Sequence, residues 1–119
     1  MLTTTVLGGT NIVEIEFSGH LEADAMAECH RTLQQTIDEH GSIRLLARYG
    51  EIDLRKIEPA AFWEDLKNTV LIPKIDRCAI VAEQGSLRRV SEVVGRVLPA
   101  EIRTFEPADD AQARLWVAS

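Results

Sequence analysis

The sequence predicts an α/β fold: an N-terminal β-hairpin followed by parallel strands that alternate with helices lying mainly on one face of the sheet. The strongest signal is residues 75–82, a mostly apolar run that Pro73 precedes and Gly85 follows. Such a run is typical of a strand buried on both faces in the middle of a sheet. Apolar residues on either side of it recur every three or four positions, as on a helix. Alternating strands and helices imply right-handed crossovers, which collect the helices on one face.

A change in the spacing of apolar residues predicts that two strands are followed by a helix at the start of the chain. Residues 3–7 and 12–17 are extended runs joined by turn-forming residues, a pattern that predicts a hairpin. Glu14 and Glu16 alternate with apolar residues, so we expect one packed face, one face in water, and a strand toward the edge of the sheet. Residues 21–41 change to a helical period and end at a glycine, which predicts an amphipathic helix.

Prolines and glycines delimit the later elements. Charged residues alternate along the second and third predicted strands, which favours a sheet with one less covered face. That face, or an edge strand, is a candidate surface for a homodimer. We expect strands at 43–49, 75–82 and 101–105, and helices from Pro59 to before Pro73, from Ser86 to before Pro99, and over 111–117.

Composition restricts the class of protein. The length of 119 residues predicts one domain, residues 1–119. A net charge of -6 argues against nucleic acid as a partner, because phosphate binding needs a basic surface. No apolar run reaches the ~20 residues that a membrane span requires. Cys29 and Cys78 stand alone and no export signal precedes them, which predicts free thiols and a cytoplasmic location.

Four short stretches resemble the SpoIIAA-like family, a bacterial group related to STAS domains and grouped with CRAL-TRIO lipid-binding folds. The most specific is the W-x-D-x-K spacing of Trp63, Asp65 and Lys67; the others are residues 77–81, 100–105 and 113–116. The resemblance covers almost the whole chain and implies a STAS-like (βα)n superhelix. We expect the three motif residues to be structural, with Trp63 as a core anchor. Related anti-sigma antagonists carry a phosphorylated serine at the stretch matching residues 50–55, which here has no serine or threonine.

Candidate site residues lie where ligands bind in parallel sheets, beyond the carboxyl ends of the strands. An alternative is that they are ordinary solvated loop residues. His20, His30 and His40 are ten residues apart and do not converge as metal ligands, so no metal or other cofactor is expected. No catalytic motif is present, so no catalytic residue is predicted. The predicted rim comprises His20, Tyr49, Glu51, Asp53, Arg55, Glu83 and Ser86.

The predicted function is a non-enzymatic binding or regulatory module that acts through protein–protein interaction. The alternative is a small carrier or sensor of a lipid-like or other apolar ligand, which the kinship with CRAL-TRIO folds implies. The chain offers few aromatic residues with which to line an apolar cavity, three Phe, two Trp and one Tyr. The candidate dimer surface and the two predicted functions give three expected partners: a second copy of the chain, another protein or an apolar small molecule.

Overall fold

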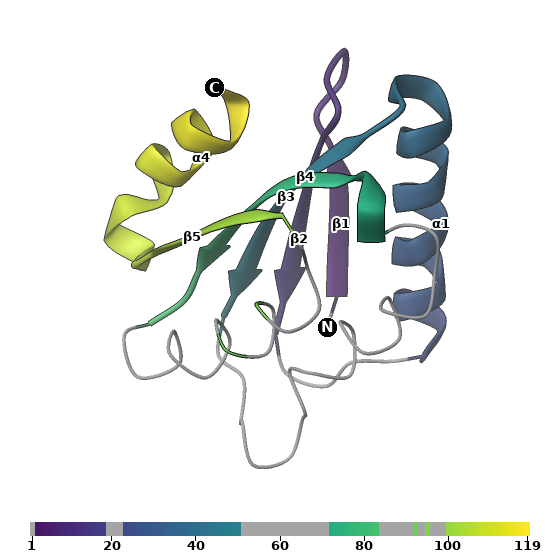
Figure 1. Ribbon diagram of the computed structural model, residues 1–119. Coiled ribbons are helices and arrows are strands. Elements are labelled where there is room, and N and C mark those ends of the chain that lie inside the picture. Colours follow the sequence, from purple (N-terminus) through teal and green to yellow (C-terminus); the bar gives the residue numbers. More distant parts are fainter. Residues whose placement is uncertain (1, 19–22, 51–71, 84–91, 93–94, 96–99) are drawn as a thin grey trace.

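One five-stranded sheet forms the centre of the protein (Figure 1). The computed structural model describes residues 2–18, 23–50, 72–83, 92, 95 and 100–119. The strand order β1-β2-β3-β4-β5 repeats the order along the chain. β1 and β2 are antiparallel, and the other neighbouring strands are parallel, as the sequence predicted. The elements are β1 (Leu2–Val6), β2 (Ile12–Phe17), α1 (Ala23–His40), β3 (Ile43–Tyr49), η1 (Ile72–Lys74), β4 (Ile75–Val81), β5 (Glu101–Phe105), η2 (Pro107–Asp109) and α4 (Asp110–Ala118).

The turn between β1 and β2 is held by hydrogen bonds within the turn. The Leu7 N–H donates to the Ile12 carbonyl at 3.1 Å. The Thr10 hydroxyl donates to the Leu7 carbonyl at 2.7 Å and accepts from the Ile12 N–H at 3.2 Å. Gly9 supplies a φ of 76°, a conformation that side chains with a Cβ rarely adopt. These contacts fix the register of the hairpin.

α1 packs along one face of the sheet and buries the apolar stripe that the sequence predicted. Cys29 and Leu33 are inaccessible to solvent, and they contact the side of β2 that carries Ile15 and Phe17. The helix ends as expected. Gly41 has a φ of 84°, and its N–H donates to the Ile37 carbonyl at 2.6 Å.

α4 lies on the opposite face (Figure 1), where the apolar contact is smaller. Its buried residues Ala113 and Val117 pack on the strands. Two arginines bind the carbonyl end of the helix: Arg44 donates to Val117 O at 3.0 Å, and Arg77 donates to Trp116 O at 2.9 Å. Cations at this end also suit the helix dipole. α4 is thus positioned by polar contacts as well as apolar ones.

One expectation about strand position and one about exposure were wrong. β4 is an interior strand buried along its carboxyl half, but β3 and not β4 is the central strand of the five. β2 is second of the five strands, toward the edge as expected, but its Glu14 is only 7% exposed because α4 covers part of that face. The expected helices at 59–72 and 86–98 fall largely outside the described residues. Among the helices that the structure describes, none is long and apolar enough to cross a membrane.

Candidate functional site

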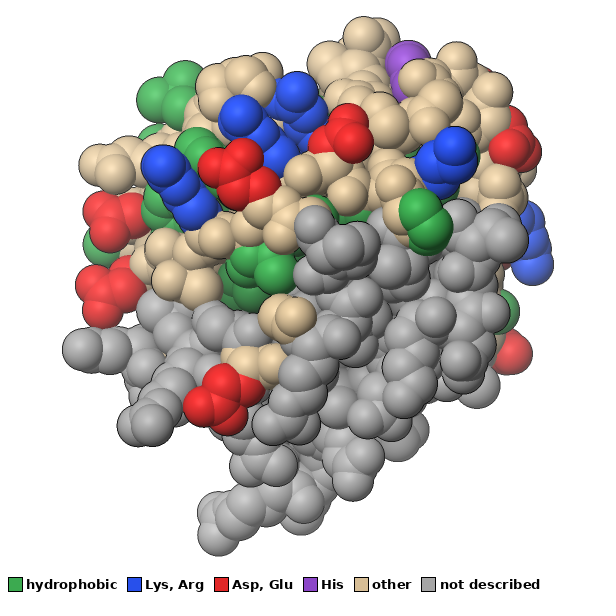
Figure 2. Space-filling view, in the orientation of Figure 1, with side chains coloured by type: hydrophobic (Ala, Val, Ile, Leu, Met, Phe, Trp, Pro, Cys, Tyr) green, Lys and Arg blue, Asp and Glu red, His purple; other side chains and the backbone are tan. Residues whose placement is uncertain are grey.

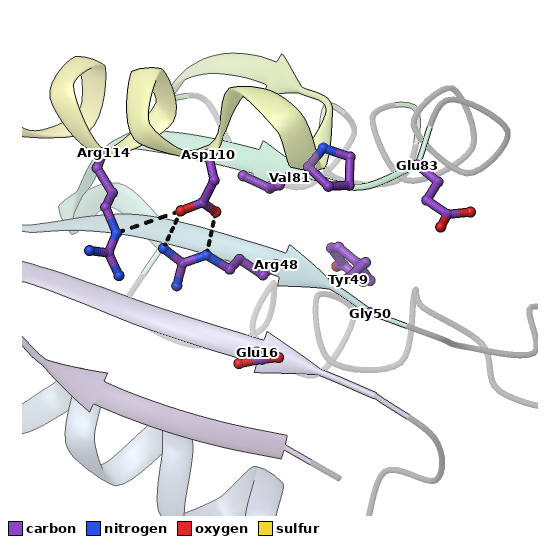
Figure 3. A pocket seen from close by; sticks show the side chains of 9 residues that line it. Glu16, Arg48, Tyr49, Gly50, Val81, Glu83, Asp110 and Arg114 are labelled. Atoms are coloured by element: carbon purple, nitrogen blue, oxygen red, sulfur yellow. Dashed lines mark hydrogen bonds and ion pairs between the residues drawn. The ribbon is translucent and has the colours of Figure 1, made fainter.

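A hollow of about 500 Å³ lies beside the start of α4, over the carboxyl ends of β2, β3 and β4 (Figure 3). This is the end of the sheet where ligands bind in parallel α/β folds. Acidic and basic side chains make up most of its lining, which predicts a polar occupant. The hollow is lined by Glu16, Arg48, Tyr49, Gly50, Val81, Glu83, Pro107, Asp110 and Arg114.

Arg48 is the centre of a charge network in this hollow. Successive residues of β3 point to opposite faces, so Arg48 faces α4 while its neighbour Tyr49 faces α1. The Arg48 guanidinium forms a two-pronged contact with Asp110, at 2.6 Å from Nε to Oδ1 and 3.1 Å from Nη2 to Oδ2. Arg48 Nη1 also donates to Glu14 on β2. This one side chain therefore ties two strands to the first turn of α4.

Arg114 closes the network from the helix side. It follows Asp110 by one helical turn, so both side chains reach toward the sheet from the same face of α4 (Figure 3). Its Nη2 donates to Glu14 Oε1 at 3.3 Å, and its Nε lies 3.6 Å from Asp110 Oδ2. Two arginines thus neutralise Glu14 and Asp110 together.

The network favours the charged forms of Arg48 and Asp110. The pKa of Arg48 is raised, chiefly by its hydrogen bond to Asp110 and further by that to Glu14, while burial opposes the shift. The pKa of Asp110 is lowered, chiefly by the same hydrogen bond from Arg48. Because both groups favour their charged forms, neither is suited to exchange protons near pH 7.

Glu16 and Glu83 differ from these paired carboxylates. Both are exposed residues in the lining of the hollow, and in the described part of the chain no salt bridge involves either. Glu16 lies on β2 beside Arg48, and Glu83 follows the end of β4 (Figure 3). Within the part of the chain that the structure describes, the hollow therefore presents two carboxylates without an ion-pair partner.

A second hollow of about 320 Å³ extends this surface toward the edge of the sheet. It shares Glu16, Arg48 and Arg114 with the first, and it continues over Thr3 and Thr5 of β1. We call the two hollows together the α4-side groove. On the view in Figure 2, acidic and basic side chains lie close together in the described, upper part of the molecule.

Of the rim residues predicted from sequence, Tyr49 and Glu83 line the groove. The Tyr49 side chain is nevertheless directed to the other face: it is 6% exposed and stacks on Phe17, with ring centroids 4.7 Å apart. Other members of the predicted rim, and the three motif residues, lie outside the described residues. These are His20, Glu51, Asp53, Arg55 and Ser86, with Trp63, Asp65 and Lys67.

The central groove residues Arg48, Asp110 and Arg114 were not predicted as site residues. Two signals were available. Arg48 and Glu16 have opposite charges on strands expected to be neighbours, and they prove to be register partners. Asp110 and Arg114 are spaced four apart, as in a helical ion pair. The sequence did not indicate that the last helix packs on the face of the sheet to which the Glu16 and Arg48 side chains point.

The two cysteines are buried on the α1 face. Burial raises the pKa of the Cys29 thiol to about 11 and that of Cys78 to about 12. Both are free thiols, and at neutral pH they hold their protons. Among the described residues, no group of three or more His, Cys, Asp or Glu side chains could hold a metal ion.

The fold and the site together define a class of protein: a five-stranded α/β domain with a polar groove at the carboxyl ends of its strands. The chain belongs to the SpoIIAA-like family, whose model matches residues 12–118. No curated protein matches the sequence. In structure it is similar to an uncharacterised protein of the DUF3478 family with a SpoIIAA-like fold, from Shewanella loihica PV-4. That match has 18% identity and a TM-score of 0.66, and it covers 98% of this chain and 92% of the other. At this identity the likeness shows the fold alone.

Proposed function

We propose that this SpoIIAA-like domain is a non-enzymatic binding module whose α4-side groove receives a basic segment of a protein partner. The observation that carries the proposal is a pair of carboxylates, Glu16 and Glu83, that have no ion-pair partner among the described residues and line a hollow of about 500 Å³. A lysine or arginine side chain placed between them would complete the alternation of charge that the groove already contains. The net charge of -6 adds a long-range attraction for a basic partner.

The chemistry of the described site favours binding over catalysis. Arg48 and Asp110 hold their charges through their mutual hydrogen bonds, so they are poor proton carriers near neutral pH. Cys29 and Cys78 are protonated and buried, so they are poor nucleophiles. A groove whose charged groups are held in place is suited to recognising a complementary surface.

The groove does not favour the carrier of an apolar ligand. Apolar ligands bind in concave sites lined mostly by hydrophobic and aromatic side chains. Here the larger hollow has five charged residues among its nine lining residues, while Phe17 and Leu33 are packed in the core beneath α1. We therefore propose a protein partner and, because both cysteines are free thiols, action in the cytoplasm.

The test is a titration of isotope-labelled protein with a lysine-rich peptide, followed by amide chemical shifts. We expect shifts to concentrate at Glu16, Gly50 and Glu83, and to weaken as salt is added. The double substitution Glu16→Gln and Glu83→Gln should reduce affinity at least about tenfold, which is roughly 1.4 kcal/mol.

The double substitution Glu28→Gln and Glu39→Gln is the matched control. It removes two carboxylates whose side chains are 66% and 75% exposed on α1, and it leaves the groove unchanged. Affinity should be retained in this variant. Shifts spread evenly over the surface, or an equal loss in the control and in the variant at Glu16 and Glu83, would mean that only net charge is recognised and would refute the groove.

A further inference from the structure

The two edges of the sheet differ in how they are protected. β5 carries Glu101 and Arg103, and charged side chains on an edge strand discourage pairing with another chain. β1 has the sequence Leu-Thr-Thr-Thr-Val, with no charge and no proline. Threonine and valine favour extended backbone, so β1 has the composition of a strand that pairs on both sides. Within the described residues, β1 pairs only with β2.

The hairpin register shows which backbone groups of β1 are available. The Leu7 N–H donates to the Ile12 carbonyl, so Leu7 directs its N–H toward β2, and this direction alternates from residue to residue along an antiparallel ladder. Thr3 and Thr5 therefore direct their N–H and C=O groups toward β2. The residues that direct theirs away from β2, along the outer edge, are Leu2, Thr4 and Val6.

We infer that β1 pairs antiparallel with β1 of a second copy of this chain, about a two-fold axis at Thr4. In this register Thr4 faces the partner copy's Thr4, and Leu2 faces its Val6. Every outward backbone group of β1 then has a partner, and the same surface serves both copies, as a two-fold interface requires. The inference is independent of the proposed function, because it uses the edge of the sheet and not the groove.

The side chains of β1 also favour this register. Val6 is 43% exposed, which is unusual for an apolar residue of this structure, and on the α1 face it would contact the partly buried Leu2 of the other copy. On the opposite face Thr3 would meet Thr5, a favourable cross-strand pair. The corresponding arrangement of β5, centred on its middle residue, would place Arg103 against Arg103, and like charges directly opposite are destabilising.

Pairing through β1 has a consequence for the groove. The α4-side groove extends over Thr3 and Thr5, on the strand that would lie at the two-fold axis. The two grooves would then meet on one face of a continuous ten-stranded sheet, twice the five strands of one copy. A partner with two basic segments could bind both copies and gain avidity.

Sedimentation velocity over a range of protein concentrations tests the inference. We expect the wild type to approach twice the mass of one chain and Val6→Lys to remain at the mass of one chain, because a lysine on each copy charges the edge. Leu115→Lys is the matched control: Leu115 is 73% exposed on α4, and this variant should dimerise like the wild type.

Thr4→Pro provides a second variant, because it removes an N–H that points away from β2 and so preserves the hairpin ladder. Its folding is checked by circular dichroism, and it should also be monomeric. Amide hydrogen exchange gives a residue-level measure: Thr4 and Val6 should become protected as concentration rises, whereas Thr3 and Thr5 are protected throughout. A monomeric wild type, or a dimer that Val6→Lys and Thr4→Pro leave intact, would overturn the inference.

Discussion

The two faces of the sheet are stabilised in different ways. Beneath α1 lies a continuous apolar cluster in which Phe17, Leu33 and Leu45 are all at most 1% exposed. Beneath α4 the apolar cluster is smaller, and beside it the strands carry Glu14 and Arg48. Apolar burial stabilises by about 25 cal/mol per Å², whereas ion pairs that stay partly hydrated contribute little net free energy. We infer that the α1 face supplies most of the stability, whereas the α4 face carries the candidate site.

The contacts that position α4 also differ in kind from the contacts that supply most of the stability. Paired charges have defined geometry, as in the two-pronged contact between Arg48 and Asp110, and this fixes where α4 begins. At its other end the helix is held by Arg77, whose guanidinium also lies 5.2 Å from the centre of the Trp116 ring. Polar contacts at both ends thus orient a nine-residue helix over a small apolar contact.

The largest expected effect compares the same substitution on the two faces. Val13→Ala, in the α1 cluster, should lower the free energy of unfolding by about 2–3 kcal/mol, because the surrounding core is closed and leaves a cavity. Val81→Ala, on the α4 face, should cost only about 1–1.5 kcal/mol, because Val81 borders the groove and its surroundings can relax. Urea unfolding followed by circular dichroism measures both values.

Leu115→Ala is the control for this pair, since Leu115 is 73% exposed and its truncation should change the free energy by less than about 0.5 kcal/mol. If Val81→Ala proved as costly as Val13→Ala, the two faces would contribute equally and the distinction between them would fail.

Arg48→Met should have the next largest effect. Glu14, with a side chain only 9% exposed, would lose its main partner, and Asp110 would lose both hydrogen bonds from Arg48. Arg114 remains near Glu14, at 3.3 Å, so we expect a loss of about 1–2 kcal/mol and not the larger cost of an isolated buried charge. Amide exchange should rise most in α4.

Arg31→Met removes an arginine from an exposed pair on α1, where Arg31 lies 2.6 Å from Glu28 and is 63% exposed. It should cost less than about 0.5 kcal/mol. Equal losses in the two arginine variants would show that the network under α4 is no more than a surface ion pair.

Much of the α1 face could be predicted from sequence because it follows local rules. The spacing of Cys29, Leu33 and Ile37 predicts the buried stripe of the helix, and Gly41 predicts its end. The strand at Ile43–Tyr49 was predicted with the same bounds. These features depend on residues that are close together in the chain, so the spacing of apolar residues and a helix-ending glycine are sufficient to predict them.

The α4 face could not be predicted in the same way because it depends on where distant segments meet. Arg48 and Asp110 are 62 positions apart, and Arg114 and Glu14 are 100 apart. Local pattern reveals that each is charged, but not that the last helix returns to cover Glu14. The expectation that Glu14 faces water was wrong for this reason.

The smallest expected effect concerns pH and tests whether charge positions α4. The folded-state pKa of Asp110 is lowered, chiefly by its hydrogen bond from Arg48, so its stabilisation is present above the unfolded value of about 3.9. It is lost as pH falls through the lower folded value. Asp110→Asn should therefore cost roughly 0.5–1 kcal/mol at pH 7, as for a partly exposed pair, and progressively less below pH ~4. Urea unfolding of both proteins across this range measures the difference. A difference independent of pH would mean that Asp110 acts through shape and hydrogen bonding alone, so that the α4 face, like the α1 face, is held without a contribution from charge.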